Sequence, residues 1–183
     1  MGRILAISNR KGGSGKTTTA VNVAAALALR GAKVLAIDAD PQAHTTLSYG
    51  CREHRDGLYA VLVDGTAPEK AMWETKISGL TIIPGSRRLL HFENAMMGKP
   101  DARYVLSTVL SSLSRAYDYV IIDTPPTVSL LMVSALIASS QVYVPLQAHF
   151  LSLEGLAEMV SIVSKINDRY GKELVIAGVI PTF

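Results

Sequence analysis

The chain has 183 residues, of which 49% are apolar and 18% charged, and this composition excludes a disordered segment. Its 18 lysine and arginine residues outnumber its 15 acidic residues, so the net charge of +3 permits attraction to nucleic acid without establishing it. No apolar run has the length that a bilayer-spanning helix needs, and we expect no membrane partner. The length suits one domain, and we expect residues 1–183 to form a single domain.

Cys51 is the single cysteine, so no disulfide can form within the chain. This usage is typical of the reducing cytoplasm, and one cysteine cannot build a Cys-rich metal site. The first residues lead directly into an apolar run, so we expect no signal peptide and a cytoplasmic protein.

Strand-like apolar runs alternate with helical patterns along the chain. The predicted strands are residues 3–8, 33–37, 80–83, 119–122, 141–145 and 174–180. The predicted helices are residues 16–30, 102–116, 128–138 and 153–170, with short helices at 58–63 and 70–73. This alternation predicts an α/β fold, a parallel sheet flanked by helices on both faces.

A glycine-rich loop, K-G-G-S-G-K-T at residues 11–17, stands between the first predicted strand and the first predicted helix. Its glycines let backbone N–H groups converge on phosphate oxygens, and the helix start adds a partial positive charge. Lys16 can reach outer phosphates, and the Thr17 hydroxyl suits Mg²⁺. The loop therefore predicts a P-loop NTPase-like fold. The predicted nucleotide-binding residues are Lys11, Gly12, Gly13, Ser14, Gly15, Lys16, Thr17, Thr18 and Pro181.

The loop departs from the strict phosphate-binding pattern in two places. The pattern requires glycine at position 10, where this chain has Arg10, and an additional lysine, Lys11, follows it. Taken by itself, Lys11 is equally well explained as a solvated surface lysine.

Three acidic residues follow predicted strands, where open α/β sheets bind their ligands. Asp123 comes after an apolar run and is predicted to hold Mg²⁺, with a turn before the next two prolines as the alternative. Asp38 and Asp40 alternate in an extended segment, so they point to opposite sides and have different roles. We predict that Asp40 orients an attacking water. Asp38 is predicted to hold either Mg²⁺ or the following loop, and a plain turn before Pro41 is the alternative for it.

These ordered motifs resemble the ParA/Soj-type partition ATPases, which are relatives of MinD and carry a deviant Walker A loop. The matching pieces are residues 11–19 with the helix 20–29, the run Asp38-Ala39-Asp40-Pro41-Gln42, and residues 117–126, 142–145 and 152–156. Arg10 and Ser14 replace the commonest family choices, Gln and Val. Ala43-His44 replaces the usual Gly-Asn.

The resemblance implies a homodimer that forms on binding ATP and Mg²⁺, with Lys11 reaching the phosphates bound by the second subunit. Lys11, Lys16 and Asp40 would then be catalytic residues, and Thr17, Asp38 and Asp123 metal residues. It also implies hydrolysis of ATP to ADP at a weak basal rate, stimulated by a ParB-type activator. The implied role is partition of a plasmid or chromosome, through non-specific DNA binding on the nucleoid.

The same resemblance implies that this domain lacks its C-terminal part, where the family's main DNA-contacting residues lie. Basic residues within the chain are candidates for phosphate contacts, although a solvated surface explains them as well. They are Arg87, Arg88, Lys99, Arg103, Arg115, Lys165, Arg169 and Lys172. Three alternatives stay open: positioning of another cargo, a MinD-like regulator of the cell-division site, and a nucleotide-dependent scaffold that does not hydrolyse.

Overall fold

The structure is a computed structural model that describes residues 2–51, 57–148 and 152–182. In this part of the chain, seven strands form one sheet in the order β3-β4-β2-β5-β1-β6-β7. All neighbours are parallel except β3 and β4, so the predicted parallel sheet is confirmed apart from one edge strand. The strands are β1 (Arg3–Ile7), β2 (Val34–Asp38), β3 (Trp73–Glu74), β4 (Leu80–Ile83), β5 (Tyr119–Asp123), β6 (Gln141–Gln147) and β7 (Val175–Thr182).

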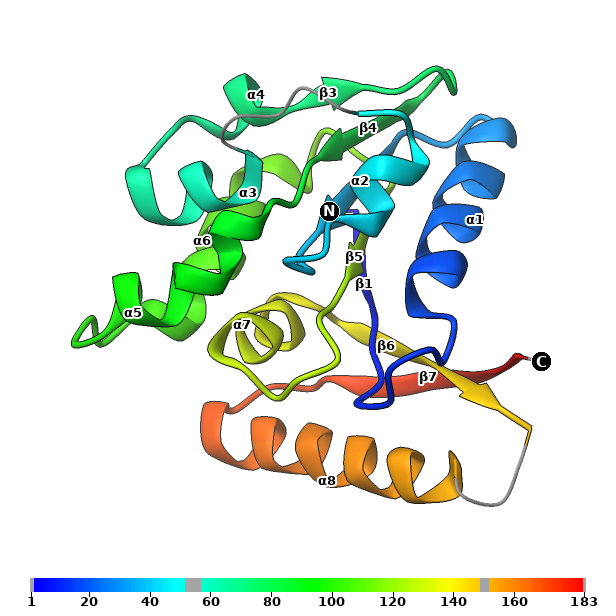
Figure 1. The fold of residues 1–183 in the computed structure, drawn as a ribbon, viewed down its shortest axis with the longest axis vertical. Coiled ribbons are helices and arrows are strands. Elements are labelled where there is room, and N and C mark those ends of the chain that lie inside the picture. The colour runs from blue at the N-terminus through cyan, green and yellow to red at the C-terminus, as the bar shows by residue number, and fades with distance from the viewer. Residues whose placement is uncertain (1, 52–56, 149–151, 183) are drawn as a thin grey trace.

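Helices lie on both faces of the sheet (Figure 1). The α-helices are α1 (Lys16–Leu29), α2 (His44–Ser48), α3 (Gly57–Tyr59), α4 (Pro68–Ala71), α5 (Phe92–Met96), α6 (Val105–Leu113), α7 (Leu130–Ala138) and α8 (Ser152–Tyr170). A π-helical segment covers Ala60–Asp64, and 3₁₀ turns cover Arg87–His91 and Ala102–Tyr104.

The alternation of side chains along each strand divides the core between the two faces. On β1, Leu5 and Ile7 pack with the buried alanines of α1, while Ile4 faces the layer that contains α6. Ala6 joins a third cluster, in which β6 packs against α7 and α8. The sheet is therefore apolar on both sides, as its continuous hydrophobic strands predict.

The middle of the chain differs most from the sequence-based expectations. The helix predicted at residues 70–73 is wrong in its bounds, because α4 starts at Pro68 and Trp73 begins β3 instead. Proline suits a first helical position, and Trp73 pairs with Ile82 of β4. The helices α2 and α5 were not predicted, since five residues are too few to show a helical period.

The carboxyl ends of the three adjacent strands β2, β5 and β1 bring the predicted site residues to one edge of the sheet. Asp123 pairs in register with Ile7 on one side and with Asp38 on the other. The glycine-rich loop leaves β1 at this same edge and enters α1. The sheet thus places the carboxylates of Asp38 and Asp123 side by side at the edge from which that loop departs.

Candidate nucleotide-binding site

The loop predicted to bind phosphate borders a cavity of about 390 Å³. Gly13 and Gly15 have φ angles of 71° and 87°, a left-handed conformation that glycine adopts without strain. Besides the loop, the cavity is bordered by residues from the β2 and β5 ends. The lining is Gly12, Gly13, Ser14, Gly15, Lys16, Thr17, Thr18, Asp40, Gln42, His44 and Pro126.

Lys16 lies inside the loop rather than in solvent. Its side chain is buried, and Nζ donates a hydrogen bond to the carbonyl oxygen of Lys11 at 3.1 Å. Burial lowers the pKa of the Lys16 ammonium, and the charges of Asp123 and Asp40 oppose that effect. The lysine therefore places a desolvated cation at the floor of the loop, where a phosphate would complete its hydrogen bonding.

One carboxylate oxygen of Asp123 connects the start of α1 with α2. Its Oδ2 accepts hydrogen bonds from the hydroxyls of Thr17 and Thr45, each at 2.8 Å. Its Oδ1 is buried and has no hydrogen-bond partner. Burial raises the pKa of this carboxyl to about 6, although both threonine hydroxyls act in the opposite direction.

The donor set around Asp123 fits Mg²⁺. An unpartnered buried carboxylate oxygen beside a threonine hydroxyl offers the hard oxygen ligands that this ion prefers. No cluster of three or more His, Cys, Asp or Glu side chains that could hold a metal occurs among the described residues. Mg²⁺ does not need such a cluster, because it retains waters and binds one or two protein oxygens together with phosphate.

Asp38 holds the segment that follows β2. Its Oδ2 accepts bonds from the Thr46 backbone N–H at 2.8 Å and the Thr46 hydroxyl at 2.6 Å, and its Oδ1 accepts from the Asp40 N–H at 3.2 Å. Burial raises the pKa of Asp38 to about 7. Both oxygens are engaged by protein donors, so the structure favours the loop-holding role of the two roles predicted for this residue.

Asp40 differs from Asp38 as the alternation along the segment predicts. Asp38 is fully buried, whereas Asp40 borders the cavity beside the loop. The Asp40 Oδ1 accepts the Gln42 N–H at 2.9 Å, which fixes the carboxylate at the cavity wall. This position suits a residue that orients a water toward a bound phosphate.

The other predicted residues lie outside the cavity lining. The Lys11 ammonium is 3.5 Å from Ser152 Oγ at the start of α8, and its side chain does not border the cavity. Pro181 is exposed on β7 and does not border it either. Its neighbour Thr182 donates from Oγ1 to the Ser14 carbonyl oxygen at 3.0 Å, so β7 contacts the loop from outside.

Sequence reasoning missed three polar residues that shape the site. Asn9 is buried at the end of β1, where its Nδ2 donates to the Pro145 carbonyl oxygen at 2.7 Å and its Oδ1 accepts the Lys11 N–H at 3.1 Å. Thr45 and Thr46 bind the two buried carboxylates from α2. The adjacent threonines after the Asp38–Gln42 run are the one signal that pointed to them.

The candidate DNA-contacting residues are only partly brought together. Arg103 and Arg169 lie over the Tyr170 ring, at 5.5 and 5.8 Å from its centroid, and Lys165 borders the same groove as Arg169. Arg88 instead pairs with Asp64 at 3.0 Å. Among the described residues, no helix combines the length and apolar character needed to cross a bilayer.

Comparison with known proteins agrees with this geometry. The AAA domain family matches residues 2–176. The sporulation initiation inhibitor protein Soj of Bacillus subtilis is 36% identical over 184 residues, covering all of this chain and 73% of Soj. The chromosome partitioning protein ParA of Caulobacter vibrioides is 39% identical over 184 residues, covering 98% of this chain and 69% of that protein.

A solved structure extends the comparison to the fold. Cobyrinic acid a,c-diamide synthase from Mycobacterium smegmatis, with bound ADP and magnesium, superposes with a TM-score of 0.94 at 32% identity. The match covers 99% of this chain and 74% of the synthase chain.

The sheet order, the left-handed glycines of the loop and the Thr17–Asp123 pair define a P-loop nucleoside triphosphatase fold. Within that class, the chain belongs to the ParA/Soj-type partition ATPases.

Proposed function

We propose that this protein is a Mg²⁺-dependent ATP hydrolase that acts as a switch in DNA partition. The observation that carries the proposal is the buried, unpartnered Oδ1 of Asp123 beside the Thr17 hydroxyl, at the mouth of a glycine-rich loop. A buried carboxylate oxygen without a partner is costly, and a bound cation would offset that cost. Residues 1–183 would form one ATPase domain.

Each residue of the site has a role in this proposal. Thr17 and Asp123 would hold Mg²⁺, which, when bound, neutralises charge on the phosphates. The backbone N–H groups of Gly12 to Thr18 and the Lys16 ammonium would bind the phosphate oxygens. Asp40 would orient the attacking water from the cavity wall, while Asp38 keeps α2 in place.

Lys11 would act on a second copy of the chain rather than on its own cavity. Its ammonium lies 3.5 Å from Ser152 Oγ and its side chain is not among those that border the cavity, which supports a role on the nucleotide of a partner subunit. A cation supplied in this way stabilises the charge of the transferring phosphoryl group, as an arginine finger does. Dimer formation would then depend on the γ-phosphate, and hydrolysis would release the dimer.

The biological setting follows from the family. The name of the ParA relative supports a role in chromosome partition. To this role we add, as parts of the same proposal, a ParB-type activator and a nucleoid-associated location in the cytoplasm. The group around Tyr170, formed by Arg103, Lys165 and Arg169, is the part of this chain that supports weak non-specific DNA binding.

The test is light scattering after size exclusion, with ATP or ADP and Mg²⁺, on wild type, Lys16→Ala and Lys11→Ala. We expect a dimer with ATP that both substitutions abolish, whereas a monomer in every wild-type sample would refute the proposal. Asp40→Ala distinguishes an ATPase from a scaffold. It should retain nucleotide binding and lose turnover, while a scaffold would have no turnover to lose.

A further inference from the structure

One side of α8 contacts the segment that leads into the phosphate loop. Ser152, Gly155 and Glu158 follow one another at intervals of three residues on this helix, so each one neighbours the next on the helix surface. They approach Lys11, Asn9 and Arg10 respectively. These partners are far apart in the sequence, because Ser152 follows Lys11 by 141 positions and Glu158 follows Arg10 by 148 positions.

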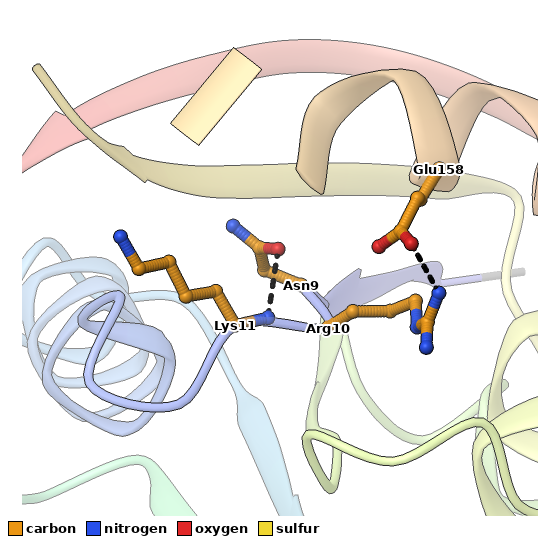
Figure 2. Close-up of polar contacts among 4 residues, drawn as sticks. All are labelled: Asn9, Arg10, Lys11 and Glu158. Carbon is orange, nitrogen blue, oxygen red and sulfur yellow. Dashed lines mark hydrogen bonds and ion pairs between the residues drawn. The ribbon is translucent and has the colours of Figure 1, made fainter. Parts of the chain in front are cut away.

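Arg10 and Lys11 leave the backbone in opposite directions from the turn that Asn9 holds (Figure 2). The Arg10 guanidinium reaches the Glu158 carboxylate at 2.5 Å, and the Lys11 ammonium lies 3.5 Å from Ser152 Oγ. Ser152 and Glu158 are separated by roughly 9 Å along a straight helix. Two neighbouring residues are thus held at two separate points of one rigid element.

The middle contact explains why a glycine occupies position 155. A Cβ atom there would lie 3.2 Å from Asn9 Oδ1, the oxygen that accepts the Lys11 N–H. Any larger residue would press on the side chain that fixes the Lys11 backbone. The helix therefore lies so close to Asn9 here that an added Cβ atom would require a shift of a few tenths of an ångström.

We propose that Arg10 and Glu158 are positioning residues, which hold the Arg10–Lys11 segment against α8 so that the Lys11 ammonium stays beside Ser152. The inference rests on the proposed function of Lys11. Preorganisation of the segment lowers the conformational entropy lost when Lys11 engages a second subunit. Arg10 stands where the resembled family most often has Gln, and its guanidinium supplies the charge that pairs with Glu158.

The test is a double-mutant cycle of Arg10→Ala and Glu158→Ala in the full chain. The first readout is the dissociation constant of the dimer, measured by sedimentation with Mg²⁺ and a nonhydrolysable ATP analogue. We expect each substitution to weaken the dimer by about two- to five-fold, the range that exposed ion pairs span. The double variant should lose no more than either single one, because both remove the same interaction. Arg10→Lys should restore most of the loss.

Matched controls separate positioning from general damage. Asp168→Ala removes an exposed carboxylate from the same helix whose hydrogen bond is to Ser164 of α8 itself, and it should leave the dimer unchanged. Affinity of the monomer for Mg-ADP, measured by calorimetry, should also be unchanged in all variants, since the Lys16 side of the loop is intact. Additive losses in the double variant, or wild-type dimerisation in Arg10→Ala, would overturn the inference.

A second readout does not depend on dimerisation. Hydrogen exchange of the Lys11 amide, which donates to Asn9 Oδ1, should be about two- to five-fold faster in Glu158→Ala and unchanged in Asp168→Ala. If wild type fails to dimerise while this exchange responds, the proposed function fails and the positioning contact stands. Unchanged exchange in Glu158→Ala refutes the contact whatever the oligomeric state.

Discussion

The hydroxyl of Thr17, in the first turn of α1, donates to Oδ2 of Asp123 at the end of β5, at 2.8 Å. This bond joins the phosphate loop to the neighbouring strand and leaves Oδ1 of the same carboxylate available. We expect Asp123→Asn to weaken binding of Mg-ADP by about 10- to 100-fold, because residues that hold or orient a metal typically contribute that much.

Calorimetry with and without Mg²⁺ checks this prediction. Thr17→Ala should lose affinity in the same direction, and its loss should shrink when magnesium is omitted. Thr19→Ala is the control, since Thr19 lies in the same helical turn but has no side-chain contact to Asp123. Equal losses with and without magnesium would show that Thr17 and Asp123 act on the nucleotide alone.

Ala43 has a φ angle of 55°, and among the described residues it is the one non-glycine residue with a positive φ. A left-handed conformation costs an L-residue about 1–2 kcal/mol, and glycine does not incur this cost. Part of that gain is offset because glycine loses more conformational entropy on folding than alanine does. We therefore expect Ala43→Gly to raise the free energy of unfolding by about 0.5–1 kcal/mol in urea. Ala67→Gly controls for capping, because Ala67 also precedes a short helix but has a φ of −58°. An equal gain at both positions would contradict the strain argument.

Gly85 lies against the backbone and side chain of Asp38. A Cβ atom there would be 2.7 Å from the Asp38 carbonyl oxygen and 2.9 Å from its Cγ. The Gly85 N–H also donates to the Thr46 hydroxyl that binds Asp38. We expect Gly85→Ala to lower the free energy of unfolding by about 1–3 kcal/mol, the cost of overpacking a buried site.

Urea denaturation without nucleotide tests that expectation. Gly12→Ala is the matched control, because a Cβ atom at Gly12 has no neighbour within 4 Å. If the urea midpoints of Gly85→Ala and Gly12→Ala agree within error, the segment around Gly85 accommodates the added methyl group at no cost in stability.

The pH dependence of stability follows from the raised pKa of Asp38. Burial raises this pKa to about 7 in the folded protein, from an unfolded value near 3.8, and Asp123 shifts in the same direction to about 6. Between these limits the folded state holds protons that the unfolded state has lost. Stability therefore falls as pH rises from about 4 to about 7 and levels off above that.

Denaturation of the nucleotide-free protein between pH 5 and pH 8 measures this slope. Asp38→Asn cannot ionise and should flatten it. A fall of stability with rising pH that this substitution leaves unchanged would exclude Asp38 as its source.

The parts of the site that the sequence predicted are those encoded by short segments. Thr17 and Asp123 stand at a helix start and a strand end, so the order of the elements was enough to bring them to one edge. The role of Asp38 was left between two possibilities because it depends on Thr46 and on the approach of Gly85, 39 residues beyond Thr46.

The position of the Lys11 side chain could not be predicted from the residues that surround it in the sequence. It is set by contacts with α8, and no periodicity or turn rule links residues so distant in sequence. The edge strand β3 was not predicted for the same reason, because its two residues form a strand only by pairing with β4.

One oxygen of Asp123 takes hydroxyls from two helices, Thr17 from α1 and Thr45 from α2. Any group that withdraws electron density from this oxygen weakens both hydrogen bonds together. The state of a buried acid is thereby transmitted to a short surface helix whose preceding residue is already under backbone strain. A nucleotide and Mg²⁺ bound as we propose would therefore act on the position of α2 through a single atom.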